Sequence, residues 1–156
     1  MKRDIHIEET YPYPPERIWR ALTNSDAMAD WLMPNTFEAK LGCRFQFRTK
    51  PAPGFDGIVN CEVLELDPPK KLVFSWCGAG LNTVVRFNLE AVAEGTHLWF
   101  EHSGFRGVKG VMVSTMLAKG WKSKILSHNL PSAAGRFDPA GIYRTLAMDG
   151  IQRDCA

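Results

Sequence analysis

Apolar and polar residues alternate in a series of short segments, and this period of two predicts β-strands. In the clearest segment, Cys43, Phe45 and Phe47 alternate with arginine and glutamine. Turn residues such as Pro, Gly and Asp separate the last four segments, which is typical of an antiparallel meander. With a further stretch near 36–40, the sheet should contain about six or seven strands. The expected strands are 4–10, 36–40, 43–48, 58–66, 72–77, 85–90 and 97–102.

Helical patterns lie on either side of the strand-rich region. Two short helices, 16–22 and 27–31, are expected after the first strand, with prolines at the entrance of the first and N-cap residues before the second. The segment 106–131 can form a helix of about five or six turns. Pro131 and the Ser-Ala-Ala-Gly after it are expected to end it. Two rows at i, i+4 spacing are predicted to face the core: Val113, Leu117, Trp121 and Ile125 in one, and Val108, Met112 and Met116 in the other.

The long helix is the only predicted element able to cover the apolar face of the sheet, which favours an α+β fold. At 156 residues the chain is expected to hold a single domain. We predict that this domain spans 1–132. The remaining 133–156 would be a C-terminal tail with a short helix near 140–148.

Charge and composition exclude several classes of protein. A formal net charge of +2, without a basic run, argues against nucleic-acid binding. No apolar run approaches membrane-spanning length and the N-terminus does not resemble a signal peptide, so no membrane contact and a cytoplasmic location are expected. The four cysteines form no CxxC pair, and reduced thiols are expected. His6, His97 and His128 lack ligand spacing, so we expect no metal site, and no motif indicates a cofactor.

Several blocks of the chain resemble the START-like (SRPBCC) superfamily, and within it the Aha1-type domain of activator-of-Hsp90-ATPase homologue 1-like proteins. The resemblance covers about residues 5–130 in the order of a single domain. The blocks are PERIWRALTN (15–24), ADWLMP (29–34), NCEVLELDPPKKLVFSW (60–76), GTHLWFEHSGF (95–105), and Gly120-Trp121 followed by Leu126 and Leu130.

This resemblance implies a helix-grip fold of the START and Bet v 1 type. In that fold a curved antiparallel sheet wraps around a long C-terminal helix and leaves a cavity between them. Superfamily members bind lipids, sterols, polyketides and other apolar ligands, and some are cyclases or hydrolases. In the eukaryotic co-chaperone, the Aha1-type domain is one half of a larger protein.

Two polar residues are candidates for acid/base chemistry. His102 shares a strand face with Leu98 and Phe100, so it is either a cavity anchor and proton donor or a core histidine whose hydrogen bonds are satisfied. Glu62 would be a buried carboxylate if its face of the strand 58–66 is concave, and a solvated one if Cys61 and Val63 point inward. Alternation alone does not choose between these two registers.

The predicted ligand site consists of apolar side chains and one histidine. Taken singly, each aromatic residue is more typical of an ordinary core, but as a set they match the position of the implied cavity. The set is Trp31, Phe45, Phe47, Trp76, Phe87, Phe100, His102, Met112 and Met116.

Three functions follow from these observations. We favour a non-enzymatic carrier or sensor whose partner is a small hydrophobic molecule. The alternatives are a cyclase or hydrolase that uses His102 and Glu62, and a stand-alone regulator of an Hsp90-type chaperone. A homodimer is also left open. Fold alone does not decide among them.

Overall fold

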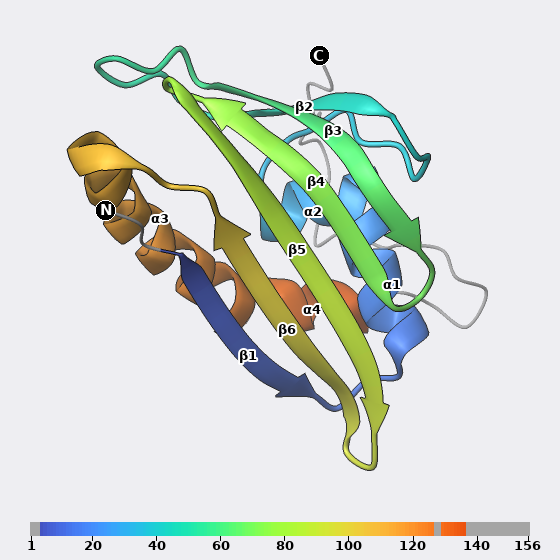
Figure 1. The fold of residues 1–156 in the computed structure, drawn as a ribbon. Coiled ribbons are helices and arrows are strands. Elements are labelled where there is room, and N and C mark those ends of the chain that lie inside the picture. The colour runs from blue at the N-terminus through green and yellow to red at the C-terminus, as the bar shows by residue number, and fades with distance from the viewer. Residues whose placement is uncertain (1–3, 127–128, 137–156) are drawn as a thin grey trace.

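The computed structural model describes residues 4–126 and 129–136 (Figure 1). The elements confirm the predicted α+β order of one strand, two short helices, a long antiparallel sheet and a long helix. They are β1 (Ile5–Tyr11), α1 (Pro15–Thr23), α2 (Ser25–Trp31), β2 (Arg44–Arg48), β3 (Ile58–Asp67), β4 (Lys71–Gly78), β5 (Leu81–Val92), β6 (Gly95–Ser103), α3 (Gly107–Leu126) and α4 (Asn129–Gly135).

The described strands form one six-stranded antiparallel sheet in the order β1-β6-β5-β4-β3-β2. Figure 1 shows the curved sheet with the described helices on one side of it, which is the arrangement of the helix-grip fold. In an antiparallel sheet, one face can be solvated while helices cover the other face.

The strand predicted at 36–40 is absent. Its neighbourhood touches the edge strand β2 at one isolated bridge between Asn35 and Phe47, supported by a bond from the Thr36 amide to the Gln46 carbonyl. A turn at 39–42 then leads the chain back to the sheet, and it ends at Gly42, whose φ of 79° favours glycine and whose amide donates to the Val63 carbonyl of β3 at 2.9 Å. The sheet therefore has the lower of the two strand numbers expected.

The inner face of the sheet is lined with alternate residues of each strand. On β3 these are Val59, Cys61 and Val63, so the register left open by the sequence is the one that points Glu62 outward. The β6 residues Leu98, Phe100 and His102 all point inward, as predicted. The other inward side chains with large buried surfaces are Phe45, Phe47, Leu72, Phe74, Trp76, Val85 and Phe87.

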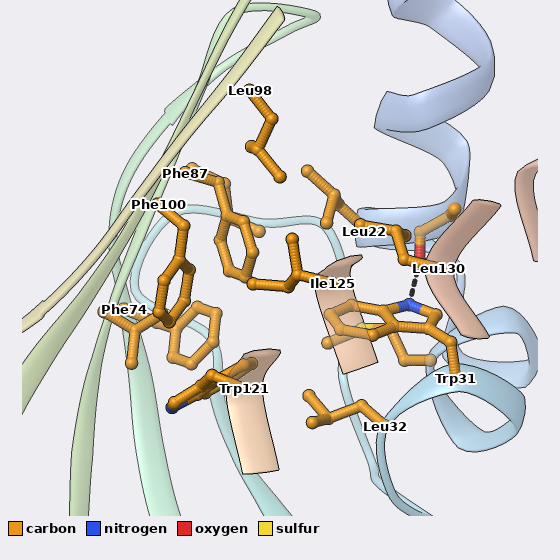
Figure 2. Close-up of a cluster of buried hydrophobic side chains, with 14 of the residues drawn as sticks. Leu22, Trp31, Leu32, Phe74, Phe87, Leu98, Phe100, Trp121, Ile125 and Leu130 are labelled. Atoms are coloured by element: carbon orange, nitrogen blue, oxygen red, sulfur yellow. Dashed lines mark hydrogen bonds between the residues drawn. The ribbon is translucent and has the colours of Figure 1, made fainter. Parts of the chain in front are cut away.

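The two short helices form where the sequence predicted them. Pro15 occupies the first turn of α1, where its missing N–H would have no helical partner. Asn24 caps α2, because its side-chain oxygen accepts a hydrogen bond from the Ala27 amide at 2.9 Å. The Trp31 indole donates to the Ala21 carbonyl at 2.7 Å, which joins α2 to α1 (Figure 2).

Only one of the two predicted rows on α3 faces the core. Trp121 and Ile125 are buried and Val113 and Leu117 pack beside them, as expected. The prediction that the second row also faces the core was wrong. The side chains of Val108, Met112 and Met116 are 72%, 68% and 65% exposed. Met112 and Trp121 are nine positions apart, about two and a half helical turns, so they point in opposite directions.

Close contacts occur near both ends of α3, one with the segment that precedes the helix and one with β1. At the first turn, a Cβ on Gly110 would lie 3.2 Å from the Phe105 carbonyl carbon, so glycine allows this close approach. Near the other end, the buried Tyr11 hydroxyl donates to the Ile125 carbonyl at 2.8 Å. Burial raises the pKa of the Tyr11 phenol above its ordinary value, so it remains a donor.

The prediction that Pro131 and the following residues end the helical region was wrong. Pro131 lies in the first turn of α4, where a proline is tolerated. Ala133 and Ala134 are buried, and Arg136 pairs with Asp30 of α2 at 3.3 Å. The domain limits at 132 and 133 remain predictions, and the helix expected near 140–148 lies outside the described residues.

Candidate functional site

A pocket of about 480 Å³ opens between α3 and one end of the sheet. Its volume falls within the range typical of small-molecule sites, about 300–1,000 Å³. Three groups of residues form its walls. They are Leu32 and Met33 after α2; Thr49, Ala52, Pro53, Gly54 and Phe55 between β2 and β3; and Val59 of β3, Trp76 and Gly78 of β4, Ala79 of the turn between β4 and β5, and Leu81 of β5.

The fourth wall is one face of α3. The pocket-lining residues of this helix are Lys109, Val113, Met116, Leu117, Gly120, Trp121 and Lys124. Their spacing of three and four places them on a single helical face. This face is apolar in its middle and carries a lysine at each end.

The loop between β2 and β3 forms the wall opposite α3. It folds into a tight turn in which the amides and carbonyls of Ala52 and Phe55 bond to each other at 2.9 Å. Gly57 closes the loop at a φ of 83°, and its carbonyl accepts from the Thr49 amide at 2.8 Å. A side chain at Gly57 would collide with the Thr49 carbonyl, so this turn requires glycine.

The structure places two of the predicted ligand-site residues, Trp76 and Met116, on the pocket wall. Met112 lies on the opposite, exposed side of α3. The remaining predicted residues lie in the core behind the pocket and do not line it. These are Trp31, Phe45, Phe47, Phe87, Phe100 and His102.

Trp121 connects the pocket wall to that aromatic core. Figure 2 shows Trp121 and Ile125 of α3 directed toward the sheet residues Phe74, Phe87 and Phe100. The Trp121 ring lies 4.5 Å from Phe100 and 5.5 Å from Trp76, centroid to centroid. Contacts of this kind add about 0.5–1.5 kcal/mol each beyond the area they bury. The aromatic wall of the pocket is therefore continuous with the core.

His102 is fully buried and both of its ring nitrogens are hydrogen-bonded. The Trp121 indole donates to Nδ1 at 3.1 Å, so Nδ1 is the acceptor and the proton is assigned to Nε2. Nε2 then donates to the Thr83 hydroxyl at 2.7 Å, which itself donates to the Trp76 carbonyl at 2.9 Å. This network links α3 to β4, β5 and β6.

Burial lowers the pKa of His102 to about 3, so the imidazole is neutral near pH 7. A neutral ring with both nitrogens engaged and no exposed surface has no free position for a substrate proton. The geometry matches a core histidine whose hydrogen bonds are satisfied, although its partners are side chains rather than a backbone carbonyl.

Glu62 lies on the outer face of β3, opposite to His102. Its carboxylate pairs with Arg44 of β2 at 3.4 Å, and a solvent-exposed pair of this kind contributes about 0–1 kcal/mol. Since His102 points inward and Glu62 outward, the structure does not bring the two proposed catalytic residues together.

Sequence reasoning missed most of the pocket. The predicted ligand site included no residue of the loop 49–55 and did not include Lys109, although Lys109 precedes Val113 by four and begins that row. The available signal was the helical face itself. Gly120, which weakens a helix, also falls on it.

Other chemistry is limited within the described part of the chain. Among residues 4–126 and 129–136, no group of three or more His, Cys, Asp or Glu side chains is placed to hold a metal ion. Cys43, Cys61 and Cys77 are free thiols, and burial raises the pKa of Cys61 above its ordinary range. None of the described helices combines the length and the apolar character needed to cross a bilayer.

Comparison with solved structures confirms the fold. Protein MLL2253 from Mesorhizobium loti is 33% identical, with 87% of this chain and 99% of that chain covered at a TM-score of 0.78. Protein BH1534 from Bacillus halodurans is 28% identical over 80% and 94% of the two chains, with a TM-score of 0.66. An Aha1 protein from Colwellia psychrerythraea, described as a dimer, is 24% identical over 81% and 93%, with a TM-score of 0.67.

No functionally curated protein matches the chain significantly. The model of the family described as "Activator of Hsp90 ATPase homolog 1-like protein" matches residues 12–131. This segment begins directly after β1 and ends within α4, so it includes β2 to β6 and α1 to α3. The chain therefore belongs to the activator of Hsp90 ATPase homolog 1-like family, within the START-like (SRPBCC) superfamily.

Proposed function

We propose that this protein binds a small hydrophobic molecule in the pocket between α3 and the sheet, and acts as a carrier or sensor in the cytoplasm. The observation that carries the proposal is the pocket of about 480 Å³, whose walls are mostly apolar side chains. Its aromatic and thioether side chains suit an apolar ligand of variable shape.

The separation of His102 from Glu62 supports a binding role over the cyclase or hydrolase alternative. Acid/base catalysis needs groups that converge on one cavity. His102 is buried behind the wall formed by Trp76 and Trp121, and Glu62 is on the far face of the sheet. We therefore assign neither residue a catalytic role.

Gly120 offers a direct test, because it lines the pocket and a Cβ built on it would have no neighbour within 4 Å. We expect Gly120→Leu to fill part of the pocket without a clash. It should weaken the binding of 1-decanol or naphthalene at least tenfold, because the leucine side chain occupies the space in which the ligand would bind. The same change should keep or raise the stability by up to about 1 kcal/mol, since glycine is a poor helix former.

The measurement is titration of the intrinsic fluorescence, since Trp76 and Trp121 both line the pocket, together with urea unfolding. Gly120→Ala is the matched control, because it gains helix propensity but adds only a methyl group. Failure of the wild-type protein to bind either neutral probe would count against the proposal, as would undiminished binding by Gly120→Leu.

A second candidate is a protein-binding role, as a homodimer or as a regulator of an Hsp90-type chaperone. The exposed row Val108, Met112 and Met116 on α3 favours it, because side chains of this kind are common at protein contacts. The family name and the dimeric Aha1 protein of Colwellia psychrerythraea point in the same direction.

The expected result for this role is a dimer in sedimentation velocity, or a faster ATPase rate of an Hsp90-type chaperone, that is lost in Met112→Lys. The control is Leu41→Lys, because Leu41 is another exposed apolar residue and lies before β2, away from α3 in sequence. A wild-type monomer that leaves the ATPase rate unchanged in molar excess would remove this role.

A further inference from the structure

Among the described residues, the charged side chains that line the pocket are all of one sign. Its walls contain two charged side chains, Lys109 and Lys124, and among the described residues no carboxylate lines it. Neither lysine has an ion-pair partner within 4 Å in that part of the chain. The whole of α3 contains four lysines and no Asp or Glu. The apolar pocket is therefore bordered by cations that the described fold does not neutralise.

The two lysines differ in what the helix itself gains from them. Lys124 lies in the last turn of α3, where a positive charge interacts favourably with the helix dipole. Lys109 lies in the first turn, where the same dipole is unfavourable to a cation. Helix stability therefore accounts for the half-buried Lys124 but not for Lys109, which is exposed to solvent.

The position of the Lys109 ammonium group is defined by the turn between β4 and β5. A Cβ placed on Gly80 would lie 3.5 Å from Lys109 Nζ, so the ammonium group lies beside this turn. The turn residue Ala79 also lines the pocket. Lys109 Nζ thus marks one end of the pocket. The apolar face of α3 extends from there to Gly120, about 17 Å along the helix at 1.5 Å per residue.

We infer that the ligand of this pocket is an amphipathic anion, with an apolar body along α3 and a carboxylate or phosphate group held by Lys109. This inference rests on the proposed ligand-binding function and adds the chemical class and the orientation of the ligand. An anionic group gives the ammonium group the partner that the described residues do not provide. The apolar body contacts Val113, Leu117 and Trp121 on the same helical face.

The test compares three ten-carbon probes that share one chain: decanoate, decyl phosphate and 1-decanol. We expect the wild-type protein to bind one or both anions about three- to fivefold more tightly than the alcohol, which corresponds to the upper part of the range for an exposed ion pair. The anion preference should weaken as salt is added, because salt screens the interaction between the Lys109 ammonium group and the anion. Preference for decanoate over decyl phosphate indicates a fatty acid, and the reverse indicates a lipid phosphate.

Lys109→Gln should abolish both the anion preference, taken relative to 1-decanol binding by the same variant, and its salt dependence. Lys124→Gln, at the other end of the same face, is the matched control and should change the preference less than twofold. Equal binding of anions and alcohol, or a preference lost only in Lys124→Gln, would overturn the inference and leave the apolar pocket in place. Absence of binding by all three probes would overturn both the inference and the proposed function.

Discussion

Replacing Trp121 with Ala is expected to lower the free energy of unfolding by about 3–5 kcal/mol, the range for removing a large aromatic side chain from a core. Trp121 is 3% exposed and contacts Trp76, Phe87 and Phe100. It also supplies the hydrogen bond to His102 Nδ1. Since domains of this size are stable by about 5–15 kcal/mol, the loss is a large fraction of the total. Urea unfolding followed by far-UV circular dichroism measures it.

Two variants separate the contributions of Trp121. Trp121→Phe keeps most ring contacts but removes the indole N–H, which leaves His102 Nδ1 without its donor and should cost about 1–3 kcal/mol. Val108→Ala changes an exposed residue on the same helix and should stay within about 0.5 kcal/mol of the wild type. If Trp121→Ala unfolds at the same urea concentration as Val108→Ala, α3 is not packed on the sheet through Trp121.

The strands could be predicted from the sequence because one face of the sheet is solvated and the other buried. Because of this difference, apolar and polar residues alternate with a period of two in strands such as β2 and β6. The register of β3 could not be read in the same way. Its outward side includes Leu64 and its inward side includes Cys61, so both faces carry apolar residues. Packing against the helices decided it.

The buried face of α3 could not be predicted either, because apolar residues lie on more than one side of this helix. Its apolar residues extend almost around the helix, and the pattern gave no reason to prefer the row of Trp121 over that of Met112. The sheet covers one side of a helix, so only one of two opposite rows can be buried. An exposed Met112 row and a buried Trp121 row are therefore a result of tertiary packing, which propensity does not contain.

The pocket was the part least accessible to sequence reasoning. Large aromatic residues fill a core as well as they line a cavity, and most of the predicted site residues proved to be core. The cavity arises where the small residues Gly78, Ala79 and Gly120 and the turn around Gly54 leave space. A residue that leaves space has no signature in hydrophobic patterning, so its role appears only when the facing elements are in position.

The stability of the protein should fall below pH 6.5 in a way that depends on His102. Its pKa is about 3 in the folded protein and about 6.5 when unfolded. Between these values the unfolded chain binds one more proton, so acidification favours unfolding, and above pH 6.5 the effect vanishes. The maximal slope is about 1.4 kcal/mol per pH unit. His102→Gln cannot titrate, so its stability should fall less steeply than that of the wild type.

The decisive quantity is the difference in unfolding free energy between the wild type and His102→Gln, measured in urea at pH 7.5 and pH 4.5. His102→Gln is expected to be the less stable protein at pH 7.5, because it loses packing against Trp76 and Phe105. The difference should narrow by about 2–3 kcal/mol at pH 4.5. Thr83→Val is the matched control, because it breaks the hydrogen bond to Nε2 but keeps the imidazole. It should therefore lower the stability while retaining the wild-type slope of stability against pH.

Acid destabilisation from carboxylates is common to all three proteins and cancels in the comparison. Parallel curves for the wild type and His102→Gln would mean that the buried imidazole accepts its proton in the folded protein, and the network joining α3 to the sheet would then need a different account.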